Sequence, residues 1–300
     1  MQVRKINAVL IALLLSFAAC QETSGPKEEL IGPNKSFDPK GLLTPEALWS
    51  FGRLGEVSVS PDNNFIAYTV TWYSIDKNKG NTELFVMSAD GSNKSQLTFT
   101  NAHEFNPLWV NEKTIAFLST EGGISQIWTI DRDGSNLKKV EGFSEDINGF
   151  KLSPNGEKLL FIAEVKVGND VADIYPDLPK TSGMIINDLM YRHWDTWEDS
   201  LFSHVFVADF SMEKIENIKD IMPNEPYDAP LKPFGGMEEI SWNSDGTAVA
   251  YTCKKLVGKE YSFSTDSDIY LYELSSGETK NLTQGMVGYE IGRASCRERV

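Results

Sequence analysis

A paired-strand pattern recurs four times along the chain and limits the folds that the chain can adopt. Each copy reads as a strand, a polar turn and a second strand in which two apolar residues precede an aromatic one. Three of the turns contain Pro-Asp, Asn-Gly or Asp-Gly, whose backbone preferences suit tight hairpins. The copies are VSVSPDNNFIAYTV (57–70), NPLWVNEKTIAFLS (106–119), FKLSPNGEKLLFIAE (150–164) and ISWNSDGTAVAYTC (240–253).

A second alternating segment follows each copy, so that each unit can form a four-stranded blade. The first two repeat intervals are 49 and 44 residues, which is the blade period of a β-propeller. A β-sandwich contains similar turns but does not explain the repeating order of the motifs. The second segments are ELFVMSADGSNKSQLT (83–98), QIWTIDRDGSNLKKV (126–140), HVFVADF (204–210) and DIYLYELSSGETKNLT (268–283). We therefore predict an all-β partial propeller over 44–289, with blades at about 57–98, 104–140, 147–223 and 237–284.

The third repeat interval is longer than the others, at 90 residues. It contains one inner hairpin and one further strand, so we predict a single blade with an insertion at roughly 165–203, rather than an extra degenerate blade. Four blades with no closing strand leave the ring open, whereas propellers avoid exposed sheet edges by closing. The sequence therefore predicts an incomplete propeller.

The first residues have the composition of an export signal. MQVRK is basic, AVLIALLLSFAA is apolar but short for a membrane span, and Cys20 follows two small residues. We expect 1–19 to be a lipoprotein signal peptide and Cys20 to carry the lipid, with an ordinary secretory signal as the alternative. Both predict an extracytoplasmic protein, in the periplasm or at the outer membrane. Residues 20–43 read as a tether, and TPEALWSFG reads as a short helix capped by Thr44.

Charge and cysteine content exclude several functions. The formal net charge of −15 argues against nucleic acid as a partner, because phosphate binding needs a basic surface. Cys253 lies on an apolar strand and reads as a small core residue rather than a nucleophile. No glycine-rich phosphate loop occurs and the cysteines are not clustered, so we expect no cofactor.

The ending EIGRASCRERV differs from the acidic, cysteine-poor sequence before it. These residues correspond to the translation of a common short-read sequencing adapter. Our hypothesis is that 290–300 are adapter read-through and that the gene continues, whereas a basic tail for an anionic partner is the functional alternative. Re-sequencing the locus tests this, because a native stop codon after Val300 would contradict it.

Three segments together resemble the N-terminal propeller of the prolyl oligopeptidase family of serine peptidases, and most closely its dipeptidyl peptidase V and acylaminoacyl peptidase branch. They are LTPEALWSFGRLGEVSVSPDNNFIAYTV, GNTELFVMSADGSNKSQLT and DLMYRHWDTWED. The resemblance implies a propeller of seven or eight blades over a C-terminal α/β-hydrolase domain that would be this chain's missing partner. It also implies a Ser-Asp-His triad, with short peptides as substrates. No G-x-S-x-G elbow occurs, so we assign no catalytic residue in this chain.

The insertion contains the remaining candidate site, in YRHWDTWED at 191–199. Carboxylates there could hold a substrate α-amine, an arginine could hold a carboxylate, and aromatic rings could line a side-chain pocket. The candidate substrate-binding residues are Arg192, Asp195, Trp197 and Glu198. The structural alternative is that the tryptophans pack on the blade and Arg192 pairs with Asp195. A metal site is not expected, since the ligands are few and their spacing fits no closed site.

Two functions remain open from the residues. The first is the propeller portion of a secreted peptidase, in which the propeller gates substrate access. The second is a non-catalytic periplasmic propeller of the TolB type that acts as a binding or assembly module.

Overall fold

The computed structural model describes residues 29–33 and 43–286. Contacts divide the chain into two compact units, 1–30 and 31–300, and the description below concerns the second. Cys20 and the ending at 290–300 lie outside the described residues, so the predictions on them stay predictions. No helix in the described ranges has the length and apolar character needed to cross a membrane.

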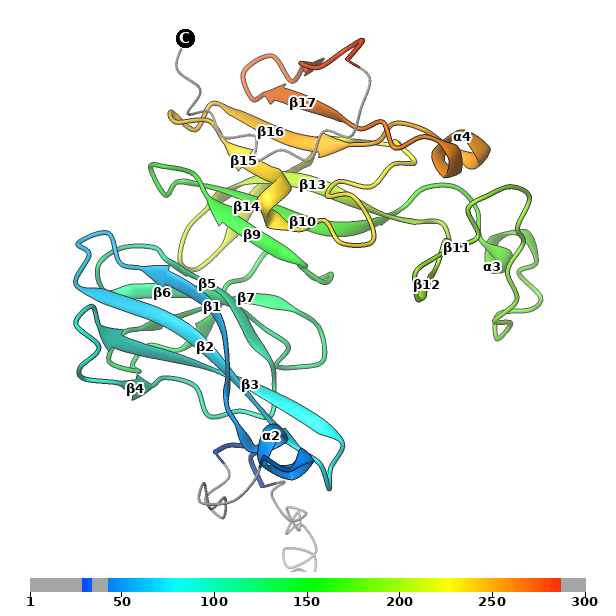
Figure 1. Ribbon diagram of the computed structural model, residues 1–300. Helices are drawn as coiled ribbons and strands as arrows, with labels where there is room; N and C mark the ends of the chain where they lie inside the picture. Colours follow the sequence, from blue (N-terminus) through cyan, green and yellow to red (C-terminus); the bar gives the residue numbers. More distant parts are fainter. Residues whose placement is uncertain (1–28, 34–42, 287–300) are drawn as a thin grey trace, which may run out of the picture. The chain divides into compact units, whose positions relative to one another are not determined.

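The described residues form four antiparallel sheets of four strands, each built from one repeat (Figure 1). In every sheet the strands lie in sequence order, which confirms the prediction of an incomplete all-β propeller. The first sheet contains β1 (Arg53–Val59), β2 (Phe65–Ser74), β3 (Lys79–Ser88) and β4 (Ser95–Gln96). The second contains β5 (Glu104–Trp109), β6 (Thr114–Ser119), β7 (Gln126–Asp131) and β8 (Lys138–Lys139). The third contains β9 (Gly149–Leu152), β10 (Lys158–Lys166), β13 (Leu201–Phe210) and β14 (Ile215–Asp220). The fourth contains β15 (Ile240–Trp242), β16 (Ala248–Cys253), β17 (Asp268–Glu273) and β18 (Thr279–Asn281).

The first hairpin of each repeat closes through a turn whose residues suit it. In the first sheet, the Ser60 hydroxyl donates to a carboxylate oxygen of Asp62 at 2.5 Å, and Asn63 has a φ of 60°. Gly156 and Gly246 occupy the matching turns of the third and fourth sheets, at φ of 73° and 71°. Asparagine and glycine adopt this left-handed region most readily, which explains the turn residues in the repeat.

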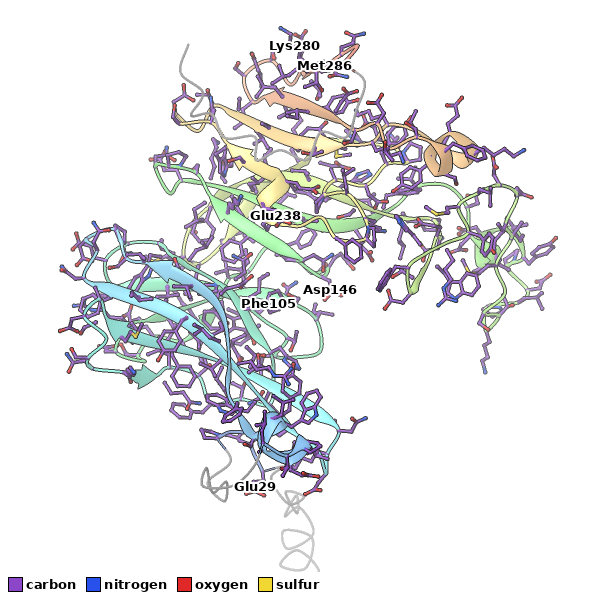
Figure 2. All side chains as sticks on the ribbon, in the orientation of Figure 1. Glu29, Phe105, Asp146, Glu238, Lys280 and Met286 are labelled. Carbon is purple, nitrogen blue, oxygen red and sulfur yellow. The ribbon has the colours of Figure 1, made fainter. Side chains whose placement is uncertain are left out.

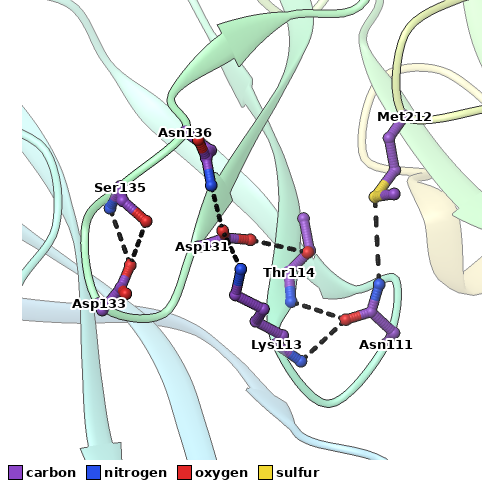
Figure 3. Close-up of polar contacts among 8 residues, drawn as sticks. All are labelled: Asn111, Lys113, Thr114, Asp131, Asp133, Ser135, Asn136 and Met212. Carbon is purple, nitrogen blue, oxygen red and sulfur yellow. Dashed lines mark hydrogen bonds and ion pairs between the residues drawn. The ribbon is translucent and has the colours of Figure 1, made fainter.

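A hydrogen-bonded carboxylate also orders the second hairpin of the second sheet (Figure 3). Asp131 ends β7, forms an ion pair with Lys113 at 2.8 Å and accepts a hydrogen bond from the hydroxyl of Thr114 at 2.8 Å. The side-chain amide of Asn136 donates to its other oxygen at 2.6 Å. Lys113, then Asn136, lowers the pKa of Asp131 to about 2. The turn is therefore fixed by a carboxylate that stays ionised at neutral pH.

Three apolar clusters join neighbouring sheets. Figure 2 draws all described side chains on the ribbon, with Phe105, which packs against the second cluster, labelled. The motif of two apolar residues and an aromatic lies on the second strand of each sheet, where Phe117, Phe161 and Tyr251 are almost completely buried. Strands β6 and β10 belong to sheets that pack between two others, which covers both of their faces. Strand β16 packs on the third sheet through the cluster that contains Tyr251. Cys253 is also fully buried, which confirms that it is a core residue, and burial raises the pKa of its thiol.

The first sheet differs because one of its faces is largely uncovered in the described part of the chain. Leu54, Val57 and Val59 of β1 are 68%, 55% and 52% exposed. Val57 pairs with Tyr68 and Val59 with Ile66, so the uncovered face is apolar across at least two strands. A face of this composition is suited to packing against another sheet.

The insertion extends the third sheet rather than forming a blade of its own. The β10–β13 ladder runs from Lys158 opposite Asp209 to Lys166 opposite Leu201, as the single-blade prediction requires. Between these strands the chain forms α3 (Val171–Ile174) and a short hairpin of β11 (Arg192–His193) and β12 (Thr196–Trp197).

Three short helices complete the secondary structure of the described residues: α2 (Pro45–Ser50), the 3-10 helix η1 (Met237–Glu239) and α4 (Gly258–Phe263). The side chain of Thr44 accepts a hydrogen bond from the backbone N–H of Ala47 at 3.2 Å. The predicted cap and helix are therefore confirmed. Helix α4 has no such signal, because Val257 at its N-terminus makes no side-chain cap hydrogen bond.

Candidate functional site

A pocket of about 420 Å³ opens beside the insertion. We call it the insertion pocket. Three segments distant in sequence form its walls: the insertion itself, the crossover from β14 to β15, and the loop from β16 through α4. They contribute 167–171, 183–186, 189–191 and 198–200, then 226–228, then 256–258 and Tyr261. A pocket at the junction of several loops is a usual place for a ligand.

Apolar side chains form most of the pocket wall although they are accessible to solvent. Met184, Ile185 and Ile186 are 40%, 47% and 45% exposed, and Val257 is 54% exposed. Gathered apolar groups that remain exposed usually mark a surface that binds something. The wall therefore suits an apolar ligand group.

Four carboxylates also line the pocket, and no lysine, arginine or histidine does: Asp170, Glu198, Asp199 and Asp228. Two of them already have cationic partners. Asp170 pairs with Lys166 at 2.8 Å, and Asp228 pairs with Lys232 at 3.1 Å. Their negative charge is therefore partly neutralised within the protein.

Glu198 is a half-buried lining carboxylate that forms no ion pair with another described residue, although the charge of Lys232 acts on it. Among the described residues its side chain forms no hydrogen bond or ion pair, although its backbone N–H donates to the carbonyl of Tyr191 at 3.1 Å. Burial, followed by the charge of Asp228, raises the pKa of Glu198. A cationic group in the pocket would oppose both effects, because an opposite charge stabilises the ionised carboxylate.

The pocket wall formed by α4 is held by a lysine that follows β16. The ammonium of Lys254 donates to the backbone carbonyls of Tyr261 and Ser264, and lies 4.0 Å from the centre of the Tyr261 ring. Gly258, at φ of 56°, lies against the side chain of Asp188 in the insertion, where a Cβ atom would overlap that carboxylate. These contacts bring α4 and the insertion together at the pocket.

The four predicted site residues lie on or next to the β11–β12 hairpin, but they do not gather around the pocket. Arg192 pairs with Trp197 across the hairpin, and its guanidinium lies 5.6 Å from the centre of the indole ring. Asp195 lies at the exposed turn. Of the four predicted residues, only Glu198 lines the pocket.

The alternative in which the tryptophans pack on the blade and Arg192 pairs with Asp195 does not match the structure. Trp194 and Trp197 are 71% and 51% exposed, so neither is buried in a blade. Trp194 instead contacts the ring of Phe234 edge to face at 5.4 Å. No ion pair joins Arg192 to Asp195 within the described ranges, because the guanidinium lies over Trp197.

Two curated proteins match most of this chain in sequence. It is 43% identical over 249 residues to dipeptidyl-peptidase 5 of Porphyromonas gingivalis, covering 83% of this chain and 36% of that protein. It is 38% identical over 259 residues to dipeptidyl-peptidase 5 of Porphyromonas endodontalis, covering 86% of this chain and 37% of that protein. The chain is homologous to dipeptidyl-peptidase 5. It spans just over a third of the length of these relatives.

Solved structures show the same fold at lower identity. The acylaminoacyl peptidase of Pyrococcus horikoshii matches with a TM-score of 0.55 and 17% identity, over 78% of this chain and 33% of that one. An acylaminoacyl peptidase in complex with a chloromethyl ketone matches with a TM-score of 0.54 and 15% identity, over the same shares. No protein-family model matches the chain. The sequence matches confirm the resemblance to dipeptidyl peptidase V, and the solved structures show a fold shared with acylaminoacyl peptidases.

Most of the pocket residues of this dipeptidyl-peptidase 5 homologue were missed by sequence reasoning. Asp228 stands between Tyr227 and Pro230 in a crossover that reads as a polar connection, and Tyr261 lies on a helix without a cap signal. The one available signal was an acidic residue flanked by aromatic and proline residues in PYDAP. In the described ranges, no group of three or more histidine, cysteine or acidic side chains gathers as a metal site would require.

Proposed function

We propose that this chain is the propeller portion of a secreted serine peptidase of the dipeptidyl- or acylaminoacyl-peptidase type. The peptidase would hydrolyse short peptides. The observation that carries the proposal is the 43% identity to dipeptidyl-peptidase 5 over 83% of the chain. The partial propeller supports a role in substrate access, because a propeller beside a catalytic domain admits only small substrates. In this proposal the catalytic serine would lie in an α/β-hydrolase domain outside the propeller.

Within that function we propose that the insertion pocket binds the amino-terminal end of the peptide. Its apolar wall suits an apolar first side chain, and the unpaired Glu198 suits the α-ammonium group of the peptide. The exposed pair of Arg192 and Trp197 suits a contact with peptide outside the pocket, with Asp195 at the hairpin turn beside it.

Steady-state kinetics of the full-length protein with two reporters test the role of Glu198. One reporter is a dipeptide with a free amine, and the other is the same dipeptide with an acetylated amine. Glu198→Gln should raise KM for the free-amine reporter by about tenfold or more and leave the acetylated reporter almost unchanged.

Asp195→Asn is the matched control, since Asp195 is equally acidic and lies on the same hairpin but outside the pocket. It should change neither KM by more than about twofold. Equal effects of Glu198→Gln on both reporters would contradict an ammonium contact at Glu198.

We further propose that the protein is exported and anchored by a lipid on Cys20, which supports an outer-membrane or periplasmic location. Labelling cells with an alkyne fatty acid tests this. The wild-type protein should incorporate the label and sediment with membranes, whereas Cys20→Ser should do neither. Unchanged labelling of Cys20→Ser would rule out this anchor.

A further inference from the structure

His204 is a fully buried histidine whose two ring nitrogens both face hydrogen-bond acceptors. It lies on β13 with 0% exposure. Its Nδ1 is 2.9 Å from a carboxylate oxygen of Asp220, at the end of β14. Its Nε2 is 2.9 Å from the backbone carbonyl oxygen of Glu225, in the crossover to β15.

These partners constrain the protonation of the ring. A backbone carbonyl can only accept, so Nε2 must carry a hydrogen. A neutral ring would then present its Nδ1 lone pair to the carboxylate of Asp220, which is repulsive unless that carboxyl is protonated. The other oxygen of Asp220 accepts the backbone N–H of Met222 at 2.7 Å, which favours the ionised carboxylate.

We propose that His204 is a buried imidazolium that positions one wall of the insertion pocket. It ties β13 to the crossover one residue before Pro226, and residues 226–228 line the pocket. Two backbone contacts flank the tie: the N–H of Ile221 donates to Val205 at 3.0 Å, and the N–H of Ala229 donates to Ser203 at 2.8 Å. His204 therefore lies between the two points at which the crossover leaves and rejoins β13.

The charged groups around the ring are consistent with a cation. Asp220 lies on β14, Asp228 lies on the crossover, and Glu225 on the crossover is itself paired with Lys255 at 2.6 Å. β10 places Ala163 opposite His204, and Phe206 lies on the same face of β13, so these two neighbours are apolar.

Burial alone would lower the pKa of His204, but the hydrogen bond and charge of Asp220, with the Glu225 carbonyl, raise it above its usual value. Because the pKa of the folded state is raised, the stabilisation is complete below the unfolded pKa and is lost as pH rises through the folded one.

His204 is connected to the wall of the insertion pocket through its neighbour on β13. Ser203, next to His204, donates its backbone N–H to a carboxylate oxygen of Asp228 at 2.8 Å, which holds this pocket carboxylate against β13. The ligand role of the pocket rests on the proposed function, whereas the charge of His204 and the order of the crossover do not.

Nuclear magnetic resonance of the full-length protein with 13C-labelled histidine Cε1 tests the charge, with His204→Gln assigning the signal. The His204 signal should keep the position of an imidazolium at pH values above the ordinary histidine midpoint near 6.5. Asp220→Asn keeps the ring and should move its titration to lower pH. A neutral ring at pH 7 in the wild-type protein would overturn the proposal.

Hydrogen exchange tests the positioning role separately. In Asp220→Asn and His204→Gln, amides of 221–229 should exchange at least about tenfold faster, while β16 keeps wild-type protection. His103→Gln is the matched control, since His103 is exposed, and it should leave this segment unchanged. Unchanged exchange in both His204-site variants would overturn the positioning role. Neither readout uses a peptide, so failure of the proposed function would not affect them.

Discussion

Glu104 is a carboxylate that the fold buries without a cation. It begins β5, is 1% exposed, and accepts hydrogen bonds from the hydroxyls of Thr100 at 2.8 Å and Ser119 at 3.1 Å on one oxygen. Its other oxygen is buried with no hydrogen-bond partner among the described residues. Burial is the main reason that the pKa of Glu104 rises to about 7, with the charge of Glu83 adding to it. The protonated form is therefore favoured in the folded protein at mildly acidic pH.

This burial predicts that the junction between the first two sheets becomes less stable as pH rises. The folded pKa of about 7 lies above the unfolded value of 4.5, so the protonated folded state is fully favoured below about pH 4.5. That advantage is lost as pH rises through 7 and amounts to roughly 3 kcal/mol. Glu104→Gln cannot ionise, so its denaturation midpoint should exceed the wild-type midpoint at pH 9 and approach it near pH 5.

Urea denaturation of the full-length protein at these two pH values measures the difference. Glu112→Gln is the control, because Glu112 lies in the turn between β5 and β6 but is exposed. It should follow the wild-type pH dependence. Parallel profiles for wild type and Glu104→Gln would show that Glu104 is not protonated in the folded protein.

At the scale of elements, Gly142 allows the outer edges of the second and third sheets to meet. The backbone N–H of Glu141 donates to the carbonyl of Glu213 at 3.0 Å, and that of Ile215 donates to the carbonyl of Glu141 at 2.8 Å. Gly142 follows at φ of 113°, and a Cβ atom there would overlap the backbone carbonyl oxygen of Ile215. The contact requires glycine both for its backbone angle and for the space.

Gly142→Ala should therefore lower the free energy of unfolding by about 3 kcal/mol or more. Gly134→Ala is the matched control, since Gly134 has φ of 84° but no atom within 4 Å of the added Cβ. It should cost only about 1 kcal/mol. Thermal midpoints of both variants provide the measurement, and equal shifts would show that the sheet-to-sheet approach is not tight at Gly142.

The elements that local sequence encodes were predictable, and those that depend on distant contacts were not. Alternating apolar residues and turn chemistry identified the hairpins, and Thr44 with Pro45 identified α2. The β11–β12 hairpin and α4 have no comparable pattern, because each is stabilised by contacts such as Trp194 with Phe234 or Lys254 with Ser264. Such contacts join residues ten or more positions apart, so no short-range sequence pattern records them.

The candidate site follows the same rule. Sequence reasoning located the insertion and Glu198, because aromatic and charged residues concentrate there. It did not find Asp228 or Tyr261, since their place in the pocket depends on how the third and fourth repeats meet. It also could not distinguish Glu198 from Asp195, because both side chains are acidic and only the fold decides which of them lines the pocket.

At the scale of the whole molecule, the uncovered face of the first sheet predicts how the isolated chain behaves. Leu54, Val57 and Val59 expose an apolar surface that suits another sheet. Residues 21–300 alone should therefore associate in size-exclusion chromatography and bind an apolar dye, and Val57→Lys with Val59→Lys should reduce both. A monodisperse wild-type monomer that unfolds cooperatively would contradict this prediction.

Activity of the full-length protein tests the central claim, that this propeller portion belongs to a serine peptidase. Folded, purified protein should be labelled by a fluorophosphonate probe and should release the chromophore of a dipeptidyl or acyl-aminoacyl reporter. Prior labelling should abolish that release, because both reactions would use the same serine. Folded full-length protein that neither reacts with the probe nor cleaves either reporter would contradict the account.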